Sequence, residues 1–195
     1  MKIITSISVI ICLLALIATS CSETPKPAEK SIAQVTDTVA LIAQGQYLVG
    51  IMGCHDCHSP KRMGPNGPEL IPELLLSGYP GDRPLVKGDM KALPPGWAFV
   101  NDDLTSFTGP WGRSFAANLT SDPTGIGNWT EEQFRKALTQ GKFMGVDNSR
   151  MLLPPMPWQN FINIRNEDLR AIFFYLKSTK PVNNVVPGPI PPNEL

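Results

Sequence analysis

The chain has 195 residues, and its 17 basic side chains are balanced by 17 acidic ones, so the formal net charge is zero. This balance gives no indication of binding to nucleic acid or to an anionic membrane surface. The sequence also contains no internal repeat, no phosphate-binding loop and no Ser/His/Asp set. Its length is sufficient for one folded domain with a sizeable insertion.

The first 20 residues have the composition of an export signal. Lys2 is followed by the apolar segment Ile3–Ile17, which is too short to span a membrane, and small residues precede Cys21. A bacterial lipobox usually carries Leu, Val or Ile three residues before the cysteine, whereas this chain has Ala18 there. We expect residues 1–20 to be a lipoprotein signal peptide and Cys21 to be lipidated. The alternatives are an ordinary cleaved signal and an uncleaved anchor.

Two further segments are expected to lie outside the folded domain. Residues 21–36 contain prolines and charged groups but few large apolar ones, which is typical of a flexible tether. The segment 182–195 is rich in proline and is expected to be extended along the surface. The domain itself is therefore placed at 37–181.

Three helices are predicted from apolar periodicity and end signals. The first runs from about Asp37 into the segment Cys54–His58, with Gly45 at a point where another helix could approach closely. The last begins after Asn166 as N-cap and has a regular apolar face. These two helices are expected to cross, with Gly45 facing Ile172 and Tyr175. A shorter helix opens with a capping box at 130–133 and stops at residue 141.

The segment from about 61 to 128 has a different composition. Nine prolines and many glycines exclude long helices and favour an irregular insertion. One part of it could form a small β-hairpin, with Trp97–Val100 and Leu104–Thr108 as strands and residues 101–103 as the turn. The alternative is a surface loop.

The most informative stretch of the chain is Cys54-His55-Asp56-Cys57-His58. The spacing Cys-x-x-Cys-His lets two thiols add to the two vinyl groups of one haem and lets the histidine reach the iron. Zinc would need a second ligand pair, which the sequence lacks, and a thioredoxin-like pair or a structural disulfide would not explain His58. The motif therefore predicts one covalent haem c at Cys54 and Cys57, with His58 as an iron ligand. Once His58 is bound, histidine-based hydrolysis is excluded.

The opposite side of the iron must be filled by methionine, lysine, water or nothing, because the chain has no third histidine. Met156 is the best candidate, because the prolines around it stiffen the loop that would aim its thioether. Trp158 lies in the same loop and is also predicted to contact the haem. Met144 and Met151 are the alternatives. Three further methionines are poorly placed in the sequence to be the ligand: Met52, Met63 and Met90.

Partly buried haem propionates would need hydrogen-bond donors, because an unpaired carboxylate in an apolar site is costly. Arg113, Asn118 and Trp129 are the candidates. Each has an ordinary alternative: Arg113 as a surface charge, Asn118 as a turn residue and Trp129 as part of the core.

Several segments taken together resemble the single-haem bacterial class I cytochrome c proteins. The similarity covers nearly the whole chain from about Leu41 to Val186. The segments that carry it are Gly45–Val49, Gly53–His58, Gly109–Gly112, Asn118–Pro123, Gly125–Thr130 and Pro155–Trp158. The chain is also similar to cytochrome subunits of periplasmic dehydrogenases, which usually carry three haem motifs where this chain carries one.

This resemblance implies an all-α class I cytochrome c fold with crossing N- and C-terminal helices, a central haem crevice and a small strand addition. It implies His58 and Met156 as axial ligands. It further implies that a proline carbonyl after the haem motif accepts the Nδ1 hydrogen of His58, for which Pro68 is the candidate and Pro65 the alternative.

The expected function is one-electron transfer by a carrier that is not itself an enzyme and that is lipid-anchored on the periplasmic or cell-surface side of a bacterial membrane. Its partners would be a redox donor and a redox acceptor. Two alternatives remain. One is a five-coordinate haem enzyme or gas/peroxide sensor, and the other is a bound cytochrome subunit of a dehydrogenase or oxidase complex.

Overall fold

The computed structural model describes the backbone of residues 28–86 and 94–195, and the side chains of 37–86 and 94–195. The predicted signal peptide, Cys21 and Met90 lie outside the described residues. The chain divides into two units, residues 1–36 and 37–195, and the second contains the whole of the predicted domain. Within the described part of the chain, no helix combines the length and the apolar composition that crossing a bilayer requires.

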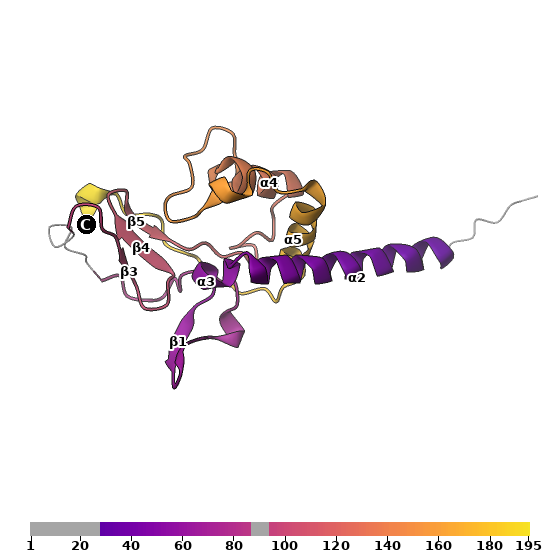
Figure 1. The fold of residues 1–195 in the computed structure, drawn as a ribbon, viewed down its shortest axis with the longest axis horizontal. Coiled ribbons are helices and arrows are strands. Elements are labelled where there is room, and N and C mark those ends of the chain that lie inside the picture. The colour runs from indigo at the N-terminus through magenta and orange to yellow at the C-terminus, as the bar shows by residue number, and fades with distance from the viewer. Residues whose placement is uncertain (1–27, 87–93) are drawn as a thin grey trace, which may run out of the picture. The chain divides into compact units, whose positions relative to one another are not determined.

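Helices form most of the regular structure of the described residues (Figure 1). The α-helices are α2 (Ala28–Ile51), α3 (Cys54–His58), α4 (Glu131–Gln140) and α5 (Asn166–Ser178), and short 3-10 turns are η1 (Pro72–Leu74), η3 (Phe143–Gly145), η4 (Trp158–Phe161) and η5 (Pro192–Glu194). Helical backbone thus begins at Ala28, inside the range for which the sequence suggests a tether.

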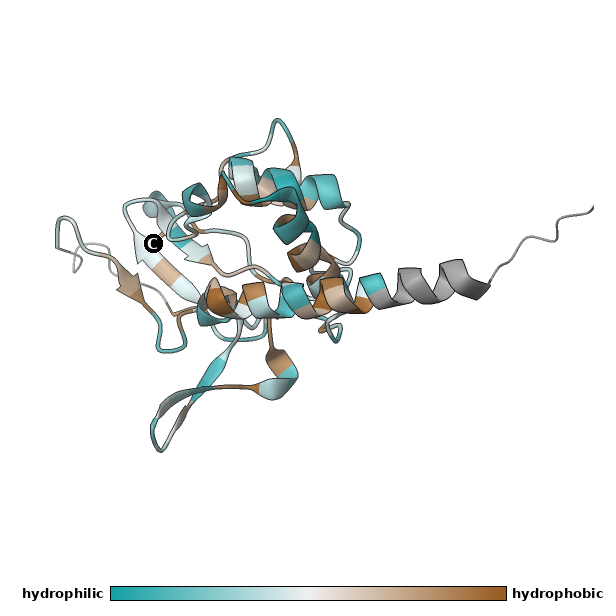
Figure 2. Ribbon diagram, turned by 45° about the vertical axis from the view of Figure 1, so that its right-hand side comes forward, coloured by the Kyte–Doolittle hydropathy of each residue, from teal (hydrophilic) through white to brown (hydrophobic). Residues whose placement is uncertain are grey.

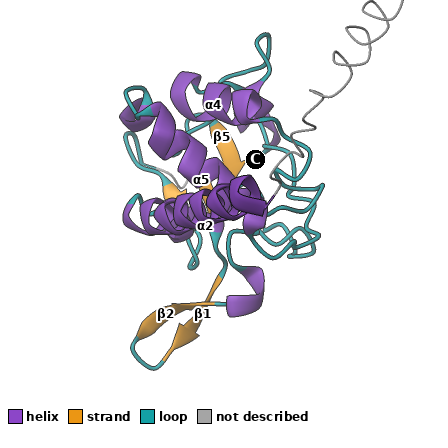
Figure 3. Ribbon diagram, turned by 90° about the vertical axis from the view of Figure 1, so that its right-hand side faces the viewer, coloured by secondary structure: helices purple, strands orange, loops and turns teal. Residues whose placement is uncertain are grey.

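Two small antiparallel sheets accompany the helices (Figure 3). β1 (Lys61–Gly64) pairs with β2 (Gly67–Leu70). β3 (Phe99–Val100), β4 (Ser106–Gly109) and β5 (Gly112–Phe115) form the second sheet in that order. The fold is therefore mostly helical with small sheets, rather than all-α.

The insertion is more ordered than its composition suggests. The predicted hairpin is confirmed as β3–β4, but β5 extends it, and the hairpin β1–β2 has no counterpart among the predicted elements. The turns that lead into β2 and β5 both have the sequence Gly-Pro-x-Gly. In each turn the first and last glycines are paired across the strands, Gly64 with Gly67 and Gly109 with Gly112. The last glycine of each turn has a positive φ, 118° at Gly67 and 95° at Gly112, which other residues rarely adopt.

The hydrophobic core lies where α2, α4 and α5 meet. Its buried residues are Val49, Leu76, Ile126, Phe134, Leu138, Leu169, Ile172, Phe173 and Leu176. Leu76 and Ile126 come from the insertion, and each is 1% exposed. Figure 2 shows apolar positions of α5 next to α2. The insertion therefore completes the core.

The sequence signals for the ends of α4 and α5 agree with the structure to different degrees. The predicted capping box of α4 is confirmed, because Thr130 and Gln133 exchange side-chain to backbone hydrogen bonds, and Gly141 ends the helix with φ of 66°. The N-cap of α5 is Arg165 rather than Asn166. Arg165 Nε donates to Asp168 Oδ2 at 2.7 Å, and this ion pair ties the preceding residue to the first turn.

The first and last predicted helices contact each other at Gly45, which is buried. A Cβ atom built on Gly45 would collide with the backbone oxygen of Ala171, and it would lie 2.6 Å from the Ala171 carbonyl carbon and 2.7 Å from Tyr175 Cβ. Gln44 Nε2 donates to Asp168 Oδ1 at 2.7 Å in the same interface. The contact with Tyr175 is confirmed, while Ala171 makes the closest approach and Ile172 is a core residue.

Gly45→Ala is expected to lower the melting temperature. Overpacking typically costs about 1–3 kcal/mol, and each kcal/mol shifts the melting temperature of a protein of this size by about 2–4 °C. Gly50→Ala is the matched control, because it lies on the same helix and a Cβ there has no neighbour within 4 Å. The control should keep or raise the melting temperature, since alanine favours helix by about 1 kcal/mol over glycine. Equal melting curves for the two variants would contradict this contact.

Candidate functional site

The motif Cys54–His58 folds as the short helix α3, directly after α2. Gly53 separates the two helices with φ of 70°, and a Cβ there would lie 2.8 Å from Asp56 Oδ2. Cys54 and Cys57 are half-buried free thiols. Because residues i and i+3 of a helix lie on the same side, the two sulfurs are presented together.

His58 is held by two contacts with the insertion. Its Nδ1 lies 2.7 Å from the carbonyl oxygen of Ala117, and its own carbonyl accepts a hydrogen bond from the amide of Gly78 at 2.8 Å. A carbonyl can only accept, so Nδ1 carries the hydrogen and Nε2 keeps its lone pair. This arrangement is typical of a metal-binding histidine, whose second nitrogen is oriented by an oxygen acceptor.

The resemblance implies Pro68, or Pro65, as the acceptor for His58, but the structure has the Ala117 carbonyl in that position. Pro68 lies in β2, where it pairs with Met63, and Pro65 is in the turn of the same hairpin. Pairing in this hairpin carries residues 61–70 through a separate sheet, and the chain returns to His58 first at Gly78, which bonds to the His58 backbone, and again after β5, beside the imidazole. The carbonyl at that return belongs to Ala117.

His55 is also fixed, although the sequence patterns suggest no role for it. Its Nδ1 is hydrogen-bonded to Ser59 Oγ at 2.8 Å, and the same hydroxyl accepts from the amide of Leu76 at 2.8 Å. Ser59 is completely buried. The helix α3 is thus joined to the insertion at several points along its length.

Burial sets the charge state of the motif. It raises the pKa of the Cys54 thiol to about 11 and also raises the pKa of Cys57, to which Asp56 contributes and which Lys61 opposes. It lowers the pKa values of His55 and His58 below their usual range. At neutral pH both thiols and both imidazoles are therefore uncharged. Redox-active cysteines instead have lowered pKa values, so the thioredoxin-like alternative is disfavoured.

A zinc site is likewise not supported. In residues 28–86 and 94–195, no group of three or more His, Cys, Asp or Glu side chains is arranged to hold a metal ion. Two cysteines and one histidine within one short helix suit a haem, because the thiols would bond to the ring, the histidine would bind the iron, and the ring itself would supply four iron ligands.

The methionines differ in environment. Met63, Met144 and Met151 are 72%, 47% and 41% exposed. Met156 is half-buried and packs against the hydrophobic core, as do Cys54 and Met52. Exposure therefore favours Met156 over the two alternatives, Met144 and Met151.

The Met156 loop is tied to two other segments. The Pro154 carbonyl accepts from Ser114 Oγ of β5 at 2.6 Å, and the Leu152 amide donates to the Gly141 carbonyl at 2.7 Å. The indole of Trp158 lies against Gly141 so closely that a Cβ on Gly141 would collide with it. The loop is therefore held by α4 and by the three-stranded sheet.

The three candidates for propionate binding are placed in different surroundings. Both amide hydrogens of Asn118 are used, by Thr124 Oγ1 at 3.1 Å and by the Val182 carbonyl at 2.9 Å, which favours its alternative as a turn residue. Arg113, in β5, donates to Thr108 Oγ1 at 2.9 Å and to the Val86 carbonyl. Trp129 is half-buried against the core.

Comparison with known proteins finds cytochrome subunits among the proteins to which this chain is similar. The cytochrome c subunit of a quinone-dependent alcohol dehydrogenase from Gluconobacter oxydans is 39% identical over 73% of this chain. The cytochrome subunit of a fructose dehydrogenase from Gluconobacter japonicus is 28% identical over 79%. One of the subunits of a nicotinate dehydrogenase from Pseudomonas putida is 37% identical over 40%. The resemblance to dehydrogenase cytochrome subunits is therefore confirmed.

These relatives are much longer than the matched region. The chain spans 22%, 24% and 6% of their respective lengths. No family model matches the chain.

Proposed function

We propose that the chain is a one-electron carrier that holds a single c-type haem, covalently attached through Cys54 and Cys57. The haem iron supplies the redox chemistry, since it exchanges one electron at a time. The observation that carries this proposal is the contact between His58 Nδ1 and the Ala117 carbonyl, which leaves Nε2 available for the iron. The residues present fit the group, because two free thiols and one oriented imidazole share a single short helix.

In this proposal Met156 would provide the second protein ligand of the iron, with His58 as the first. Its partial burial against the core and the anchoring of its loop support this role. Partly buried apolar residues packed on the same core, among them Leu119, Trp129 and Phe161, would exclude water. A thioether ligand and a dry site both favour the ferrous state, and a closed coordination sphere prevents oxygen or peroxide from binding.

The proposed architecture is a class I cytochrome c, with α2 and α5 as its paired terminal helices around a haem crevice. The close approach at Gly45 and the hydrogen bond from Gln44 to Asp168 support this pairing. The two small sheets would then be an elaboration of that fold.

We further propose that the carrier works with a periplasmic dehydrogenase, either as a bound subunit or as its mobile acceptor. The names of its relatives, which are cytochrome subunits of alcohol and fructose dehydrogenases, favour such a partner over a free haem enzyme or sensor. The sequence carries one Cys-x-x-Cys-His motif, so these residues would provide one step of electron transfer rather than a relay of several haems.

Spectroscopy of the wild-type protein tests the function. After export with haem maturation, the protein should carry one covalent haem and be reduced and reoxidised reversibly. The ferric form should show the weak long-wavelength band of a methionine–iron bond, and the ferrous form should not bind carbon monoxide. Rapid carbon monoxide binding without that band would instead support the five-coordinate enzyme or sensor.

The proposed attachment to a membrane depends on Cys21. Lipidation of Cys21 would place the carrier at the periplasmic or cell-surface side of a membrane, because two or more acyl chains give the stable anchoring that one chain does not. Mass spectrometry of the mature N-terminus checks this: a diacylated or triacylated Cys21 is expected. An unmodified N-terminus at another residue would show that the signal is an ordinary one.

A further inference from the structure

Lys61 follows the haem motif closely and is bonded back to it. Its Nζ donates to the carbonyl oxygens of Asp56 at 2.6 Å and Ser59 at 3.1 Å, and to that of Asp103 at 3.0 Å. The carbonyl of His55 lies at 3.5 Å. An ammonium group has three hydrogens, so the three shorter contacts use all of them.

Two of these four carbonyls, those of His55 and Asp56, belong to the last turn of α3, and a third belongs to its C-cap, Ser59. The last carbonyls of a helix have no partner within the helix, and they carry the negative end of its dipole. Lys61 therefore satisfies carbonyls on both sides of His58 in the sequence, and its positive charge is favourably placed there.

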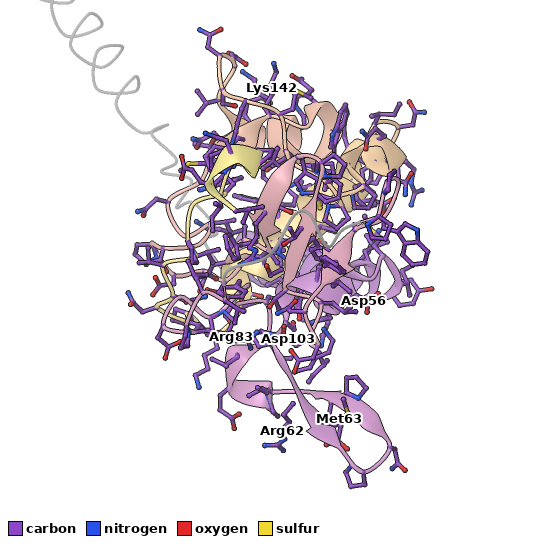
Figure 4. The ribbon with its side chains drawn as sticks, turned by 90° about the vertical axis from the view of Figure 1, so that its left-hand side faces the viewer. Asp56, Arg62, Met63, Arg83, Asp103 and Lys142 are labelled. Carbon is purple, nitrogen blue, oxygen red and sulfur yellow. The ribbon has the colours of Figure 1, made fainter. Side chains whose placement is uncertain are left out.

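The remaining carbonyl belongs to a rigid turn of the insertion. The side chain of Asp103 is 2% exposed. It accepts two hydrogen bonds from Arg83, at 3.1 and 2.6 Å, and others from Asn101 and Thr105, each at 2.6 Å. Burial would raise the pKa of Asp103, but these bonds hold it below its usual range. Figure 4 shows Arg83 and Asp103 together near the hairpin β1–β2. Lys61 thus joins α3 to a turn that is itself fixed.

We propose that Lys61 is a positioning residue for the iron ligand His58 and that its charge raises the reduction potential of the haem. This inference rests on the proposed function. The ammonium holds the last turn of α3 against the Asp103 turn, which fixes the backbone from which His58 extends. Reduction removes one positive charge from the iron, so a nearby fixed cation favours the reduced state.

The test compares Lys61→Met with Arg62→Met in the mature haem protein. Both substitutions remove one positive charge from β1, but Arg62 is exposed at the surface of the hairpin. Lys61→Met should lower the equilibrium constant for reduction about three- to tenfold, where tenfold equals about 59 mV for one electron. Arg62→Met should leave it nearly unchanged. Lys61→Arg keeps the positive charge, so its reduction potential should stay close to that of the wild type.

Amide hydrogen exchange provides the second measurement. The amides of Ser59 and Gly78 donate to the carbonyls of His55 and His58, so they report on the end of α3. They should exchange faster in Lys61→Met. If Lys61→Met does not accumulate, Lys61→Arg provides the same test of positioning. A planar guanidinium cannot direct three hydrogens onto converging carbonyls, so the two amides should also exchange faster in Lys61→Arg than in the wild type.

Two results would overturn the inference. One is a Lys61→Met protein whose potential equals that of Arg62→Met, and the other is unchanged exchange at Ser59 and Gly78. The potential can be measured only in a protein that carries its haem, and the exchange rates are compared in that same haem protein. Absence of covalent haem from the wild type would instead contradict the proposed function, so the two failures are distinguishable.

Discussion

Replacing both Cys54 and Cys57 with alanine is expected to abolish covalent haem attachment. Each thiol forms a separate thioether bond to the ring, so each single replacement should retain haem through the other bond but at a reduced level. The two thiols lie one helical turn apart and are free, so each can react independently. Haem staining after denaturing electrophoresis measures the covalent fraction directly.

Asp56→Ala is the matched control for this experiment. Asp56 lies between the two cysteines and is exposed, and it provides no bond to the ring in the proposed site. Its haem staining should equal that of the wild type. Full staining of the double cysteine variant would mean that the haem is not attached here, and the assignment of the motif would be wrong.

The features predicted correctly from the sequence are those with a local chemical signal. The capping box at Thr130 and Gln133 is a pattern of four residues, and Gly141 ends the helix because a positive φ is needed there. Gly45 could be predicted as a contact point because a glycine within an apolar helix face usually marks close packing. The structure bears out each of these features.

The insertion shows why other features were missed. Many prolines and glycines suggest irregular structure, yet two Gly-Pro-x-Gly turns each join a pair of strands. A proline after the first glycine and a second glycine, which can adopt a positive φ, at the last position are typical of a tight turn. This pattern could have been recognised in the sequence. The acceptor of His58 could not have been found in the same way. Ala117 is 59 residues away and contributes only its carbonyl, which every residue has.

The insertion contacts both halves of the candidate site. On one side, Gly78 and Ala117 bond to His58, and on the other, Ser114 bonds to the loop that carries Met156. Between Gly78 and Ala117 the chain forms the three-stranded sheet. The amide of Tyr79 donates to the Ala116 carbonyl at 2.9 Å, which closes this segment on itself. The insertion is therefore suited to hold the two proposed iron ligands at a fixed separation.

Met156→Ala is the change expected to affect redox function most. Loss of the thioether should leave water or an open position at the iron, so the long-wavelength ferric band should disappear and the ferrous form should bind carbon monoxide readily. The reduction potential should also fall, because methionine ligation favours the ferrous state. We expect the equilibrium constant for reduction to fall at least tenfold, which is about 59 mV for one electron. Visible spectra and a redox titration provide both measurements.

Met144→Ala and Met151→Ala are the controls, because both side chains are substantially exposed and each loses the same thioether. They should retain the band, the potential and the resistance to carbon monoxide. If Met151→Ala alone gave the phenotype expected for Met156→Ala, electron transfer would remain the function and the ligand would be reassigned. If none of the three changed the spectrum of a wild type that already bound carbon monoxide, no methionine would ligate the iron. A five-coordinate haem enzyme or sensor would then explain why the chain orients a single imidazole so firmly.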